Sequence, residues 1–108
     1  MKPAVLRPQA QRDRLAEVRY HRKKAGSGVA VRLVNATSAA LDQIELEPGI
    51  GSPSLGMILG IPALRTWRIA KFQLLWCYFE RDDHVDVVRL LGERQDIAEL
   101  LGDLTDEA

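Results

Sequence analysis

Arginine is the residue type in this sequence whose positions point most directly to a binding chemistry. Three short runs rich in β-branched and aromatic residues lie between positions 64 and 91, and arginines occur along them and just beyond, at Arg65, Arg68, Arg89 and Arg94. A guanidinium binds phosphates and carboxylates through two parallel hydrogen bonds. Arginines carried on one small sheet therefore predict a surface that binds a phosphodiester or an acidic peptide.

The alternative is that these arginines pair with carboxylates on neighbouring strands, as exposed cross-strand pairs do. The candidate partners in the sequence are Glu80, Asp82, Asp86 and Glu93. In that case the arginines stabilise the sheet and contact no other molecule. The sequence leaves both interpretations open.

Other chemistry has little support in the sequence. The two histidines, His21 and His84, are far apart, and the single cysteine, Cys77, has no Cys or His at ligand spacing, so we expect neither a metal nor a cofactor. Cys77 lies between two aromatic residues of a predicted strand, where a buried and inert thiol is expected. No nucleophile with an adjacent base is suggested, and we assign no catalytic residue.

Charge is unevenly distributed along a chain whose formal net charge is zero. Residues 1–36 contain nine Lys or Arg and two Asp or Glu, whereas residues 37–108 contain the other six basic and thirteen acidic residues. Such asymmetry indicates a partner of opposite charge, either an acidic protein segment or nucleic acid. A solvated basic helix without a partner is the alternative.

Length and composition predict one domain over residues 1–108, with frayed ends at residues 1–2 and 103–108. No apolar run approaches the roughly 20 residues that span a bilayer, so we expect no membrane association. The apolar stretch at the N-terminus is too short for a signal peptide, and a charged residue follows it too closely. A single cysteine fits a reducing compartment, and we expect a cytoplasmic protein.

The first half of the chain predicts a short strand and a helical hairpin. Pro3–Arg7 can form the strand, and Gln9–Lys24 is rich in good helix formers without Gly or Pro. Glycines at 26 and 28 end this helix. A second helical stripe from Val29 consists of Ala30, Leu33, Val34, Thr37, Ala40, Leu41 and Ile44, and Pro48-Gly49 ends it.

The second half predicts a sheet. Ile50–Pro62 is expected to be a loop punctuated by Gly and Pro, followed by strands over Leu64–Ala70, Phe72–Phe79 and Val85–Leu91. Phe72–Phe79 is almost continuously apolar and should be the central strand. Asp96–Leu101 predicts a final short helix. The expected fold is α+β, with an N-terminal strand, a helical hairpin, a three-stranded antiparallel meander and a C-terminal helix.

Three motifs occur in the order found in a known group of proteins. They are Pro48-Gly49-Ile50-Gly51, then Leu64-Arg65-x-Trp67-x-Ile69-x-x-Phe72, and finally Arg89-Leu90-Leu91-x-x-Arg94-x-Asp96-Ile97. From about Val5 to Leu101 the sequence resembles the RelE/ParE toxin superfamily of bacterial type II toxin–antitoxin systems. The resemblance implies the same α+β fold.

The superfamily contains two activities, and the sequence resembles one branch more than the other. RelE-like members are ribosome-dependent mRNA endonucleases that need basic residues and usually a His or Tyr near the end of the last strand. This chain has Gly92 where many members have histidine, and no tyrosine after Tyr78; arginine cannot move protons at neutral pH. The resemblance therefore implies a ParE-like, non-catalytic inhibitor of DNA gyrase. An mRNA endonuclease, or a degenerate toxin that binds only its antitoxin, are the alternatives.

The resemblance also implies partners. The toxin would form a hetero-oligomer with a cognate antitoxin, a small DNA-binding protein whose C-terminal segment wraps the toxin, and would reach operator DNA only through it. The residues assigned to antitoxin binding are Arg12, Leu15, Arg19, Arg22 and Lys23, and those assigned to the gyrase target are Arg65, Arg68, Arg89 and Arg94.

Overall fold

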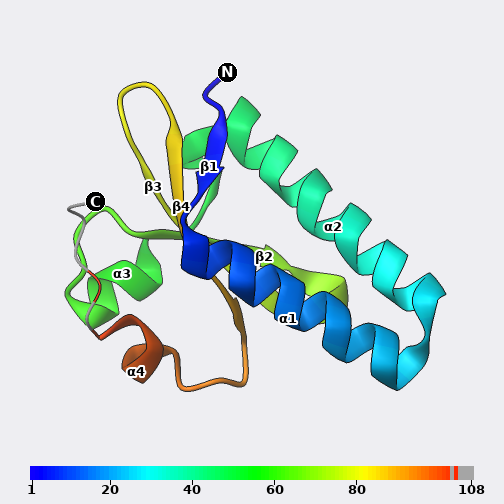
Figure 1. The fold of residues 1–108 in the computed structure, drawn as a ribbon. Coiled ribbons are helices and arrows are strands. Elements are labelled where there is room, and N and C mark those ends of the chain that lie inside the picture. Colours follow the sequence, from blue (N-terminus) through cyan, green and yellow to red (C-terminus); the bar gives the residue numbers. More distant parts are fainter. Residues whose placement is uncertain (103, 105–108) are drawn as a thin grey trace.

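The computed structural model describes residues 1–102 and residue 104 (Figure 1). In chain order the elements are β1 (Ala4–Leu6), α1 (Pro8–Ala25), α2 (Ser27–Leu46), α3 (Ser54–Leu59), β2 (Arg65–Ile69), β3 (Leu74–Glu80), β4 (Val85–Gly92) and α4 (Ile97–Leu101). The predicted α+β fold is confirmed. Of the tail expected to be frayed, residues 103 and 105–108 lie outside the described residues.

The four strands form one sheet in the order β1-β4-β3-β2. The β2–β3 and β3–β4 pairs are antiparallel, which confirms the meander, whereas β1 runs parallel to β4. The predicted central strand begins at Leu74 instead of Phe72. The reason is local, because Ala70–Phe72 forms a 3-10 turn and Gln73 has a φ of 54°, a backbone conformation that cannot continue a strand.

The helical hairpin covers one face of the sheet (Figure 1). Helix α1 begins at Pro8, where a missing N–H costs nothing, and ends at Gly26, whose φ is 92°. On α2 the predicted apolar stripe is buried at Ala30, Leu33, Thr37, Ala40 and Ile44. Part of that stripe packs with Trp76 and Tyr78 of β3 in the larger core cluster.

Helices α3 and α4 lie against the opposite face (Figure 1). The expectation that 50–62 is a loop is wrong, because this segment contains α3. Six residues are too few for a helical period to show in the sequence. A Cβ at Gly56 would lie 2.7 Å from the Leu64 carbonyl oxygen, so glycine permits the close approach of α3 to the chain before β2.

The thiol of Cys77 faces this second core cluster and is fully buried, as predicted. Burial raises its pKa to about 12, so the reactive thiolate is not formed at neutral pH. No helix among the described residues has the length and apolar character needed to cross a membrane.

Lys2 is fixed by contacts, in contrast to the frayed end expected at residues 1–2. Its backbone N–H donates to the Glu45 carbonyl oxygen at 3.2 Å. Its Nζ donates to a Glu80 carboxylate oxygen at 2.8 Å and to the Arg81 carbonyl oxygen at 2.7 Å. These bonds tie the chain before β1 to the β3–β4 turn.

Candidate functional site

Arg65 holds the turn that follows α2. Its Nη1 donates to the carbonyl oxygens of Gly51 at 2.7 Å and Gly49 at 3.3 Å. The Tyr78 hydroxyl donates to the Pro48 carbonyl oxygen at 2.6 Å and accepts from the Gly51 N–H at 2.9 Å. Arg65 and Tyr78 thus supply hydrogen-bond partners for backbone groups of this tight turn.

Arg68 pairs with Glu93, one of the acids named as the alternative to a binding role, although Glu93 follows β4 and β3 lies between β4 and β2. Its Nε and Nη2 donate to the two carboxylate oxygens of Glu93. The hydrogen bonds that Arg68 donates to this carboxylate raise the pKa of Arg68. The Arg68 side chain is about half exposed, so the pair is a surface pair of small energetic value.

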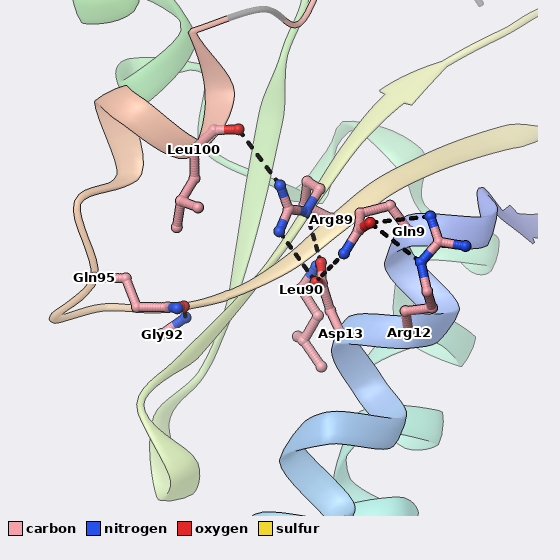
Figure 2. A network of polar contacts seen from close by, with 8 residues as sticks. All are labelled: Gln9, Arg12, Asp13, Arg89, Leu90, Gly92, Gln95 and Leu100. Atoms are coloured by element: carbon pink, nitrogen blue, oxygen red, sulfur yellow. Dashed lines mark hydrogen bonds and ion pairs between the residues drawn. The ribbon is translucent and has the colours of Figure 1, made fainter.

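Arg89 is bound to an acid that the sequence did not suggest as its partner. Its Nε and Nη2 donate to the two oxygens of Asp13 at 2.7 and 3.0 Å, and its Nη1 lies 3.4 Å from the Leu100 carbonyl oxygen (Figure 2). The Asp13 hydrogen bonds raise the pKa of Arg89. Both side chains are mostly buried, at 20% and 10% exposed.

Asp13 is needed there because β1 covers only part of β4. The parallel pairing ends at Leu6 opposite Val87, and the chain then turns into α1. Among the described residues no strand lies beside the edge of β4 beyond this point. Asp13 accepts the Leu90 N–H there at 3.0 Å (Figure 2). A side chain on α1 thereby continues the hydrogen bonding of the sheet edge.

Arg94 has the most open guanidinium of the four predicted target-binding arginines. It is exposed, and within residues 1–102 and 104 no hydrogen bond or ion pair of its side chain is found. It borders a hollow of about 380 Å³, which we call the polar hollow. The polar hollow is lined by Glu17, Tyr20, His21, Phe72, Gln73, Leu74, Gly92, Glu93, Arg94 and Gln95.

His21 is the imidazole side chain of the polar hollow. Its Nδ1 lies 2.8 Å from the Glu17 carbonyl oxygen. A carbonyl can only accept, so Nδ1 donates and the lone pair of the neutral ring is on Nε2. The ring is edge-on to Tyr20 and Phe72, with centroids 5.4 and 5.5 Å away.

On the sequence alone, neither His21 nor Asp13 is assigned a role in the binding site, although the sequence contains one signal for it. Asp13 and Glu17 are the two acids among residues 1–36, and a spacing of four places them on one side of a helix. This spacing marks a polar flank of α1 within an otherwise basic segment. The flank faces the end of β4, where Arg89 and the polar hollow lie.

The four arginines are therefore not gathered on one concave face. Arg65 and Arg89 bind backbone or side-chain groups inside the protein. Arg68 reaches the rim of the polar hollow through Glu93, and Arg94 lies at that hollow.

The opposite flank of α1 borders a different surface, which we call the apolar groove. It consists of two adjoining hollows of about 710 and 360 Å³ between α1, α2 and β1, lined by Ala4, Val5, Leu6, Gln11, Arg14, Leu15, Val18, Arg22, Ser27, Ala30, Val31 and Val34. Several of its apolar side chains are exposed, including Val31 at 58%, Val5 at 53% and Leu15 at 48%.

Two of the five predicted antitoxin-binding residues, Leu15 and Arg22, line the apolar groove. The other three, Arg12, Arg19 and Lys23, are exposed on α1. Arg14 ties the two helices together across the groove, because its guanidinium donates to Thr37 Oγ1 at 3.0 Å and to Ser38 Oγ at 2.5 Å.

Comparisons with known proteins agree with this fold. No curated protein matches the chain. A solved structure described as "Chromosomal ParDE TA system from P. aeruginosa" superposes with a TM-score of 0.70 at 16% sequence identity, covering 83% of this chain and 94% of that chain. The family described as "ParE toxin of type II toxin-antitoxin system, parDE" matches residues 4–97. The chain therefore belongs to the ParE family of type II toxin–antitoxin toxins.

Proposed function

We propose that this ParE-type toxin acts in the cytoplasm by binding DNA gyrase and that a cognate antitoxin neutralises it. The observation that carries the proposal is the pair of chemically different surfaces on the two flanks of α1. One is an apolar groove bordered by cations, and the other is a polar hollow with an open arginine. Two such surfaces suit two partners.

The apolar groove is the proposed antitoxin site. An amphipathic segment from the C-terminal part of the antitoxin would place apolar side chains against Leu15, Val31 and Val34. Acidic residues of the same segment would lie along the outward side of α1, at the exposed cations Arg12, Arg19, Arg22 and Lys23. The antitoxin would also carry the complex to operator DNA and set its hetero-oligomeric state.

Association rates test the electrostatic part of the antitoxin site. Reversing Arg19 and Arg22 to Glu should slow binding of the protein encoded beside the toxin gene at low ionic strength, because steering by opposite charge is lost. Reversal of Lys24 and Lys71 to Glu makes the same change in charge outside the groove lining and should slow binding much less. Equal association rates for the two double variants would show that Arg19 and Arg22 do not steer the antitoxin to this site.

The gyrase part of the proposal rests on a binding surface without proton transfer. Of the four arginines assigned to the target, Arg94 would touch gyrase, with Arg68 at the rim of the polar hollow. Arg65 and Arg89 would support this surface through their contacts inside the protein. Purified toxin should inhibit supercoiling of relaxed plasmid by gyrase and leave ribosome-bound mRNA intact.

His21 beside Arg94 favours ribosome-dependent mRNA cleavage as the second candidate function. A neutral imidazole can accept a proton at Nε2, and a guanidinium can stabilise charge that develops on a phosphate. His21→Gln separates the two functions. A nuclease would lose activity by orders of magnitude, whereas a binding inhibitor of gyrase should keep most of its potency.

A further inference from the structure

We propose that the Asp13–Arg89 pair sets the geometry of the polar hollow, so that Arg89 is a positioning residue and not a target contact. The inference rests on the proposed function, since it concerns the surface assigned to the target. It reverses the role that the sequence suggested for Arg89.

One wall of the polar hollow is the second half of α1, with Glu17, Tyr20 and His21, and another is the chain after β4, with Arg94. Strand pairing joins β3 to the end of β4 through Leu74 and Gly92, but among the described residues no strand pairing joins the α1 wall to the others. The hollow therefore keeps its shape only if α1 is fixed relative to the end of β4.

Asp13 provides that fixation one turn before Glu17 on the same flank of α1. Its carboxylate accepts from Arg89 Nε at 2.7 Å, from Arg89 Nη2 at 3.0 Å and from the Leu90 N–H at 3.0 Å (Figure 2). Gln9 Nε2 also donates to it at 3.0 Å. A bidentate guanidinium–carboxylate pair fixes orientation as well as distance, so α1 can neither rotate nor slide along β4 without breaking it.

Each nitrogen of the Arg89 guanidinium has an acceptor inside the protein, so three of its five N–H groups are bound within the described residues. Nε and Nη2 are bound to Asp13, and Nη1 is directed at the Leu100 carbonyl oxygen of α4 (Figure 2). Its side chain is 20% exposed. Arg94, by contrast, is exposed at the rim of the polar hollow.

A double-mutant cycle that measures gyrase inhibition decides whether Arg89 positions the polar hollow or contacts the target itself. Arg94→Gln and Arg89→Gln should each weaken inhibition by about tenfold, the size of a lost charge-assisted contact. If Arg89 acts through the hollow, the double variant should be little weaker than either single one, because coupled residues are not additive. A hundredfold loss in the double variant would make Arg89 an independent contact and overturn the inference.

Arg32→Gln is the matched control, because Arg32 is exposed on α2 and lines neither the apolar groove nor the polar hollow. It should leave inhibition unchanged. If the Arg89→Gln protein does not fold, Arg89→Lys takes its place in the cycle. It keeps the charge and loses the bidentate geometry, so it should recover part of the inhibition.

Two readouts that do not depend on gyrase keep this inference separate from the proposed function. Asp13→Asn should speed hydrogen exchange of the Leu90 amide by about tenfold or more relative to the Trp76 amide in β3, because a backbone amide at an open sheet edge exchanges readily. The NMR signals of the His21 ring should shift in Arg89→Gln and not in Arg32→Gln. Unchanged exchange and unshifted ring signals would overturn the inference, and a wild-type protein that leaves gyrase active would overturn only the proposed function.

Discussion

The two flanks of α1 differ in how their surfaces are built. The apolar groove is made of side chains such as Leu15, Val31 and Val34, which offer area and few directed contacts. The polar hollow depends on directed contacts, including Asp13 to Arg89 and His21 to the Glu17 carbonyl oxygen. We therefore expect the apolar groove to tolerate variation in its partner. The polar hollow, in contrast, should lose its geometry when one of these hydrogen bonds is removed.

The largest expected effect removes both surfaces together. Trp76 is fully buried beneath α2, and its Nε1 donates to the Thr37 carbonyl oxygen at 3.2 Å. Trp76→Ala should lower the free energy of unfolding by about 3–5 kcal/mol, because it leaves a large cavity under the helical hairpin. Urea unfolding measures this loss. Normal stability would mean that the hairpin does not depend on this core, and the two flanks would then have to be tested separately.

A charge in the apolar groove should separate the flanks. Leu15→Asp is expected to weaken antitoxin binding by about 2–3 kcal/mol, since it places a carboxylate against the apolar and acidic segment of the partner. Tyr20→Asp makes the matched change on the other flank, at a residue 56% exposed, and should leave antitoxin affinity close to that of the wild type. Titration calorimetry with the purified antitoxin measures both. A larger loss from Tyr20→Asp would exchange the roles of the two surfaces.

The pH dependence of stability should come from Asp86 near the start of β4, which lines neither surface. Burial alone would raise the pKa of Asp86, but hydrogen bonds from Arg7 and Arg81 outweigh it and lower the pKa. A lowered folded-state pKa contributes stability above the unfolded value of about 3.9, and this is lost as pH falls through the folded-state pKa. Urea unfolding at pH 7 and pH 3 should show a smaller pH-dependent loss for Asp86→Asn than for the wild type.

The smallest effect is expected at the rim of the polar hollow. Arg68 and Glu93 form an exposed pair, and such pairs contribute little to stability. Arg68→Gln should leave the melting temperature within experimental error at physiological salt. A clear drop in melting temperature would show that this pair, and not Asp13 with Arg89, holds the end of β4.

The fold was largely predictable because its signals are local. The apolar run of β3, the stripe of α2 and the glycine that ends α1 are each visible in a short window of sequence. Helix α3 was missed because six residues show no period, and its Gly56 is read as a loop residue unless the contact with the Leu64 carbonyl oxygen is known.

The candidate site was predictable only where its contacts lie within the meander and the chain just after it. Glu93 was among the acids considered for the strand arginines, and it pairs with Arg68. Asp13 is 76 positions from Arg89, and no periodicity connects a residue of the first helix with one of the last strand. His21 was examined only as a metal ligand, because its nearness to Arg94 depends on how α1 packs beside the end of β4.

In the proposed function one flank of α1 binds the antitoxin and the other binds gyrase. The most direct measurement is a gyrase supercoiling titration of the wild type, Leu15→Asp and Arg94→Gln, each with and without the antitoxin. Leu15→Asp should inhibit like the wild type and resist neutralisation, whereas Arg94→Gln should inhibit about tenfold less and still bind the antitoxin. The opposite result is full supercoiling at excess wild-type toxin, together with ribosome-dependent mRNA cleavage that His21→Gln abolishes. This result would contradict the assignment of one flank of α1 to gyrase.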